Sequence, residues 1–153
     1  MKNLILILTV LLITSCGVEP NRATAHIDEE LIPYIREFQE DCEIYGWDPK
    51  YLYRLRTIEI SDDLDVNGIT YLNSGEIYIN YNLLDNETGL RMVIYHELAH
   101  WYGLDHIDYG IMQPNYDECD CLNEDFEENW TEYVEYMMVE QEKENSDFCG
   151  HHH

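Results

Sequence analysis

Three histidines and the carboxylate of Glu97 lie close together between His96 and His106. His96 and His100 are four residues apart, so on a helix both imidazoles project from one face and reach one ion. Glu97 lies beside that ion without being a ligand. Gly103 can adopt a left-handed conformation and end the helix, so that His106 binds from another direction. Three nitrogens leave a fourth position for water, which is typical of catalytic zinc.

The chemistry expected of this group is hydrolysis. Zinc lowers the pKa of a bound water to ~7 and stabilises a developing oxyanion. Glu97 would act as the general base that takes the proton of the zinc-bound water and passes it to the leaving amine. We therefore expect one catalytic zinc ion, with His96, His100 and His106 as its ligands.

The complete pattern His-Glu-x-x-His-x-x-Gly-x-x-His resembles the signature of the metzincin clan of zinc metallopeptidases. Met112 follows His106 by six residues and fits the methionine turn that forms a hydrophobic base under the metal in that clan. The resemblance implies a zinc endopeptidase with peptide or protein substrates. It also implies that an edge strand, here residues 69–72, pairs with the substrate, with residues 76–80 as the inner neighbour.

The chain also departs from the clan. Some members have a tyrosine two residues after the turn methionine, where this chain has Pro114. The stretch before the zinc helix is short for the clan, which indicates a minimal member. A non-catalytic surface module that keeps zinc for binding is the alternative function.

The hydrophobic pattern predicts a single α+β domain over residues 26–149, with a twisted mixed sheet, an N-terminal helix, an active-site helix and a C-terminal helix. Gly46 and Gly103 are expected to end the first two helices. The predicted elements are a helix over 26–45, one or two strands within 51–60, a hairpin of 69–72 with 76–81, a helix from Asp85 or Asn86 to about 102, and a last helix from 123 or 124 to about 143.

An acidic segment precedes the predicted hairpin. Asp63, Asp65, Asn67 and Gly68 match the opening of a calcium-binding loop, but Ser74 stands where a bidentate glutamate belongs. Calcium binding and an acidic turn between strands are the two interpretations.

The N-terminus has the pattern of an export signal. Residues 1–15 read as a signal peptide whose apolar run is too short to span a bilayer. Ile13-Thr14-Ser15-Cys16 resembles a bacterial lipobox, so Cys16 would carry the lipid and residues 16–25 would form a tether. This places the domain outside the cytoplasm, anchored to a bacterial membrane. An ordinary secretory signal is the alternative. Residues 150–153 read as a terminal tail or a tag remnant, and we exclude their histidines as ligands.

The formal charge of −24, from 32 acidic and 8 basic residues, argues against nucleic acid and against direct adhesion to anionic lipid. A solvated surface and a preference for basic substrates are both consistent with this charge. We expect a monomer that meets the membrane only through its N-terminal lipid.

Four cysteines remain when Cys16 is set aside, an even number that suggests two disulfides in an exported chain. A structural zinc on these thiolates is the competing interpretation. Cys119 and Cys121 are too close in the sequence to form a disulfide with each other without strain. The candidates are Cys42, Cys119, Cys121 and Cys149.

Overall fold

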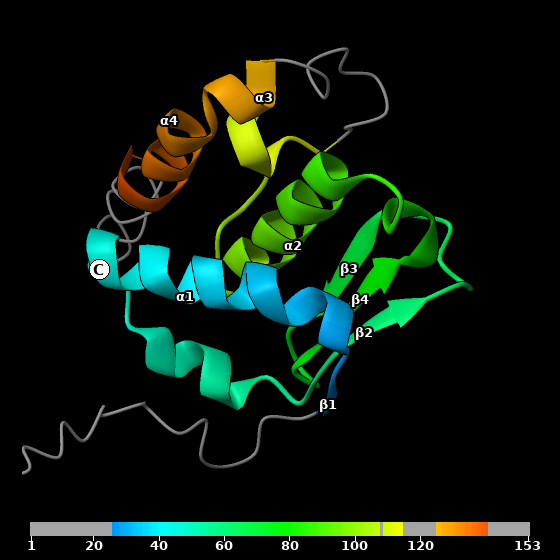
Figure 1. The fold of residues 1–153 in the computed structure, drawn as a ribbon. Helices are drawn as coiled ribbons and strands as arrows, with labels where there is room; N and C mark the ends of the chain where they lie inside the picture. The colour runs from blue at the N-terminus through cyan, green and yellow to red at the C-terminus, as the bar shows by residue number, and fades with distance from the viewer. Residues whose placement is uncertain (1–25, 108, 115–124, 141–153) are drawn as a thin grey trace, which may run out of the picture.

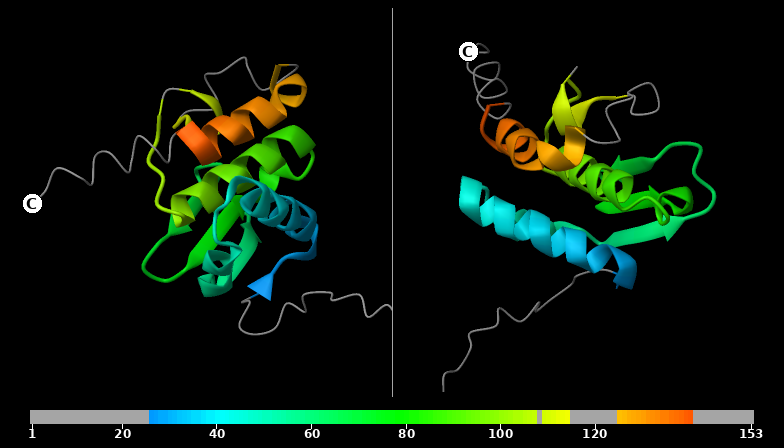
Figure 2. Two further views of the ribbon diagram at one scale, coloured as in Figure 1. Left: turned by 90° about the vertical axis from the view of Figure 1, so that its left-hand side faces the viewer. Right: turned by 45° about the horizontal axis from the view of Figure 1, so that its top comes forward.

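The computed structural model describes residues 26–107, 109–114 and 125–140. In this part of the chain a four-stranded mixed sheet has the order β1-β2-β4-β3. β1 pairs in parallel with β2 and β2 in parallel with β4, whereas β3 is an antiparallel edge strand. The long helices gather on one side of the sheet, with α2 against β3 and β4 and α1 beside α2 (Figures 1 and 2). This is the mixed-sheet α+β arrangement that the sequence predicts. The strands are β1 (His26–Ile27), β2 (Thr57–Ser61), β3 (Gly68–Tyr71) and β4 (Glu76–Asn80).

The first helix begins later than its periodicity predicts. Residues 26–27 form β1, a short 3-10 turn η1 (Glu29–Leu31) follows, and α1 spans Ile32–Tyr45. The reason is a tertiary contact, because the Asp28 carboxylate accepts a hydrogen bond of 2.7 Å from the Ile60 amide. Gly46 ends α1 in the left-handed conformation, at φ 84°, as predicted.

The segment predicted as one or two strands is half helical. A 3-10 helix, η2 (Pro49–Arg54), precedes β2, and the Asp48 side chain caps it by accepting from the Lys50 amide at 3.0 Å. A proline directly after a capping aspartate favours a helical start. The hairpin is confirmed, because β3 and β4 pair with Ile69 opposite Tyr78.

The central helix α2 (Glu87–Trp101) begins where the sequence predicts. The Asn86 side chain caps it by accepting from the Gly89 amide at 3.0 Å. Nearly the whole helix is enclosed, with Tyr95 and Ala99 completely buried. Its position between the sheet and α1 explains why its sequence is apolar on more than one face.

The last helix is interrupted within the described residues. It is divided into α3 (Asp125–Glu128), α4 (Trp130–Glu135) and a π-helical segment, η7 (Tyr136–Glu140). The 3-10 turn η4 (Gly110–Met112) precedes them in the chain. Phe126, Trp130 and Val134 are buried, as the predicted inner face requires. None of the helices in this part of the chain is long and apolar enough to cross a bilayer.

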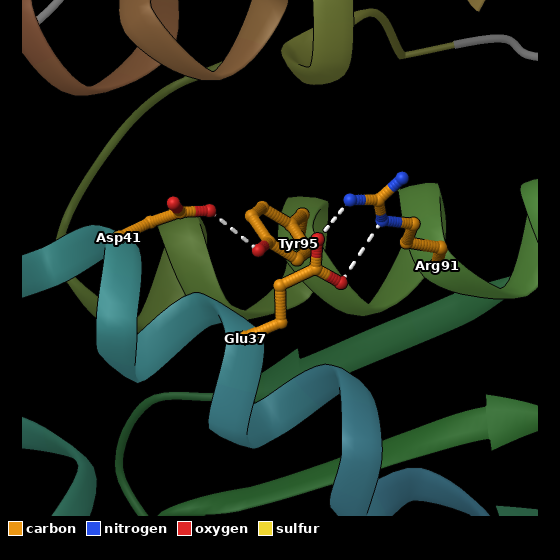
Figure 3. A network of polar contacts seen from close by, with 4 residues as sticks. All are labelled: Glu37, Asp41, Arg91 and Tyr95. Carbon is orange, nitrogen blue, oxygen red and sulfur yellow. Dashed lines mark hydrogen bonds and ion pairs between the residues drawn. The ribbon is translucent and has the colours of Figure 1, made fainter. Parts of the chain in front are cut away.

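Polar contacts join α1 to α2 (Figure 3). The Tyr95 hydroxyl donates to the Asp41 carboxylate at 2.7 Å. One helical turn earlier, the Arg91 guanidinium forms an ion pair with Glu37, and its Nε lies 3.0 Å from the carboxylate. Arg91 also lies over the ring of Trp130, so the same side chain ties α4 to this pair of helices.

The expected disulfide of Cys42 is not present. Cys42 is a free thiol with no solvent exposure, and its Sγ lies 3.7 Å from the Tyr102 hydroxyl, to which it donates. Its place on the inner face of α1 makes it a core residue. The other cysteines (16, 119, 121 and 149), the signal peptide, the tether and the terminal histidines lie outside the described residues.

Candidate metal centre

The three predicted histidines converge on one point. The Nε2 atoms of His96 and His100 are 3.0 Å apart, those of His96 and His106 are 3.1 Å apart, and those of His100 and His106 are 2.9 Å apart. Nitrogens bound tetrahedrally to zinc lie about 3.4 Å from one another. They are the one group of metal-binding side chains found among the described residues.

The other ring nitrogens explain why these Nε2 atoms suit a cation. His96 Nδ1 lies 2.7 Å from the Ile111 carbonyl oxygen, and His100 Nδ1 lies 2.8 Å from that of Leu104. A carbonyl only accepts, so each Nδ1 carries the proton and each Nε2 presents a lone pair. Lone pairs that face each other at 3.0 Å repel unless a positive charge lies between them. The donor set therefore fits a divalent metal, with backbone carbonyls orienting two of its ligands.

Gly103 brings the third histidine to the other two, as the sequence predicts. Its φ is 92°, which is a left-handed conformation that favours glycine. The Gly103 amide donates to the His100 carbonyl at 2.9 Å, and the Leu104 amide donates to Ala99 at 3.1 Å. This pair of hydrogen bonds is a Schellman motif, which ends α2 and turns the chain back toward the helix.

The predicted methionine turn lies against the same site. Met112 is buried, with 1 % of its surface exposed, and its carbonyl accepts from the Ile107 amide at 3.0 Å. The carbonyl of Ile111 in the same turn is the partner of His96. The turn is thus bonded both to the loop that carries His106 and to the first histidine.

Burial and charge keep two of the histidines neutral. Burial, together with the neighbouring His100 and His106, lowers the pKa of His96 to about 3, although the bond to Ile111 opposes this shift. Burial also lowers the pKa of His106. A neutral imidazole is the form that binds a metal. His96 is buried, His100 is half-buried and His106 is exposed, so the site opens to solvent on the side of His106.

Glu97 is held on the side of α2 that faces the edge strand. It is buried, with 5 % exposure, and the Thr70 hydroxyl lies 2.7 Å from its Oε2 and 2.9 Å from its backbone oxygen. Burial raises the pKa of Glu97 to about 7, and the hydrogen bond from Thr70 opposes the shift. A carboxyl that titrates near neutrality has the basicity that general-base catalysis needs.

Sequence reasoning missed the partners of Glu97. Gly68 begins β3, and a Cβ atom there would lie 2.8 Å from Glu97 Cγ. A glycine inside a strand is a signal of close approach, but the acidic pattern before it suggested a calcium loop instead. That interpretation gains no support, because Asp63 and Asp65 do not join a group of metal-binding side chains in the described part of the chain.

No protein-family model, curated protein or solved structure matches the chain.

Proposed function

We propose that this protein is an exported, lipid-anchored zinc endopeptidase with a metzincin-like site. The observation that carries the proposal is the convergence of three histidine Nε2 atoms, two of them from the helix that also carries a buried glutamate. His96, His100 and His106 would hold the zinc. When bound, zinc would supply Lewis acidity to the substrate carbonyl and to the attacking water.

Glu97 would supply the proton transfers of the reaction. Its position next to His96 on α2 would bring the carboxylate near the ligands. As a base it would take a proton from the attacking water, and as an acid it would give that proton to the leaving amine. The pKa near neutrality supports both steps, because neither protonation state is strongly disfavoured.

The edge strand β3 would hold the substrate backbone. The carbonyls of Asn67 and Tyr71 accept from the amides of Asn80 and Gly75, on the inner side of the hairpin. Because successive residues of a strand direct their backbone groups to opposite sides, those of Gly68 and Thr70 face the open edge. An extended peptide added to β3 would bond these two residues, beside Glu97.

The test is zinc content together with peptide cleavage. Purified protein with His151, His152 and His153 replaced by serine should contain about one zinc per chain. It should cut peptide libraries read by mass spectrometry. Glu97→Gln should keep the zinc and lose cleavage by about 100-fold or more, because the base is removed and the ligands are not.

Two controls separate the ligands from other histidines. His106→Ala should lose zinc, whereas His26→Ala, an exposed histidine of β1, should keep both zinc and cleavage. Cleavage that survives in Glu97→Gln would contradict the mechanism. Zinc retained without cleavage of any peptide pool would favour the alternative, a non-catalytic binding module.

A further inference from the structure

The hydroxyl of Thr70 is placed between two oxygen atoms of Glu97. It lies 2.7 Å from carboxylate Oε2 and 2.9 Å from the backbone oxygen, and it reaches them from a different element, the edge strand β3. A hydroxyl has one proton and two lone pairs. It donates to Oε2 when Glu97 is a carboxylate.

Gly68 makes this contact sterically feasible. It lies two residues before Thr70 and therefore on the same face of β3, toward α2. A Cβ atom at Gly68 would lie 2.7 Å from Val93 Cγ1, 2.8 Å from Glu97 Cγ and 2.9 Å from Glu97 Oε1. Contacts this short require the neighbour to move. The Glu97 side chain thus occupies the space that the missing side chain leaves.

We propose that Thr70 is a positioning residue, which together with the space at Gly68 holds the Glu97 carboxyl group in one orientation. This inference rests on the proposed function for its kinetic consequence, but not for its structural one. Thr70 does not touch the reacting atoms and acts only through Glu97. Its backbone faces the open edge of the sheet, so one residue would serve both the substrate strand and the base.

The test compares Thr70→Val, which has the same shape without the hydroxyl, with Thr70→Ser, which keeps it. Thr70→Val should lower kcat by roughly 10- to 100-fold, since a misplaced base loses much of its effect. KM should change by less than about twofold, because the backbone that would bind the peptide is unchanged. Thr70→Ser should restore most of kcat. Zinc content and the absorption spectrum of the cobalt-substituted protein should stay those of the wild type in both variants.

The helix that carries Glu97 also provides a matched control, Thr88. The Thr88 hydroxyl donates to Glu127 at 2.7 Å, a threonine–glutamate bond at the other end of α2. Thr88→Val should leave kcat unchanged. Gly68→Ala should act in the same direction as Thr70→Val, because it displaces Glu97 without removing any functional group.

Crystal structures of the metal-free variants provide a readout that does not depend on activity. The Glu97 carboxylate should leave its wild-type position in Thr70→Val and keep it in Thr70→Ser. A carboxylate that has not moved in Thr70→Val overturns the proposal, and so does a wild-type kcat in that variant. If the wild-type protein cuts no peptide, the proposed function fails and the crystal structures alone decide this inference.

Discussion

At the scale of single residues, two glycines in the same conformation have different consequences. Gly46 and Gly103 end α1 and α2 with φ of 84° and 92°. A Cβ atom at either position would meet nothing within 4 Å. The need for glycine is therefore a matter of backbone conformation alone. Only the turn at Gly103 is followed by a candidate metal ligand, His106.

We predict that Gly103→Ala and Gly46→Ala each lower the free energy of unfolding by about 1–2 kcal/mol, the cost of a left-handed L-residue. Gly103→Ala should also weaken zinc binding by roughly tenfold, because the position of His106 depends on that turn. Chemical denaturation and zinc titration against a competing chelator measure the two effects. Equal zinc affinity in the two variants would show that the turn does not set the ligand position.

At the scale of elements, α2 carries His96, Glu97 and His100, and α1 packs against α2. Burial raises the pKa of Asp41, and the hydrogen bond from Tyr95 opposes that shift. Burial also raises the pKa of Tyr95 far above its ordinary value, so the phenol stays protonated and remains the donor. The bond fixes α2 one residue before the first histidine (Figure 3).

Tyr95→Phe should lower the free energy of unfolding by about 1–3 kcal/mol at neutral pH, because the Asp41 carboxylate loses its donor. An Asp whose pKa is raised by folding stabilises the protein below its unfolded pKa, and this stability is lost as pH rises through the folded pKa. Removing the Tyr95 hydroxyl raises the pKa of Asp41 in the folded protein further. The loss of unfolding free energy in Tyr95→Phe should therefore be smaller at acidic pH than at neutral pH. Chemical denaturation of the wild type and of Tyr95→Phe, at neutral and at acidic pH, measures this difference.

Tyr81→Phe is the control for this variant, since Tyr81 is 58 % exposed. It should change the free energy of unfolding by less than about 0.5 kcal/mol at either pH. A deficit of Tyr95→Phe that grows in acid would refute the role given to Asp41.

At the scale of the whole molecule, the net charge bears on the proposed attachment to a membrane. With 32 acidic and 8 basic residues, the chain is repelled by an anionic membrane surface. A protein of this charge needs another source of membrane affinity, and covalent lipid at Cys16 would supply it. The proposed lipid anchor and the acidic surface are therefore compatible with each other.

Cys16→Ser should move the protein from the membrane fraction to the soluble fraction, because lipid attachment requires the thiol. Detergent-phase partitioning of cells that express the full chain measures this. Cys149→Ser makes the same chemical change near the other end of the chain and should leave the protein in the detergent phase. Equal partitioning of the two variants would exclude Cys16 as the anchor.

Local patterns determined most of the candidate site. The spacing of His96, His100 and His106, with Gly103 between the last two, predicts their convergence because helix geometry and a left-handed turn act over a few residues. The hairpin of β3 and β4 was predicted for the same reason, since alternation and turn residues are local signals.

Only the tertiary structure decided the features that depend on residues far apart in the chain. The pairing of β1 with β2 replaced the first turn of the expected helix. The core enclosed Cys42, which the cysteine count had assigned to a disulfide. The contact of Thr70 and Gly68 with Glu97 joins positions 27 and more residues apart, so no local sequence pattern predicts it. Sequence spacing predicts which groups share one helix or turn, whereas the packing of β3 against α2 determines what surrounds Glu97.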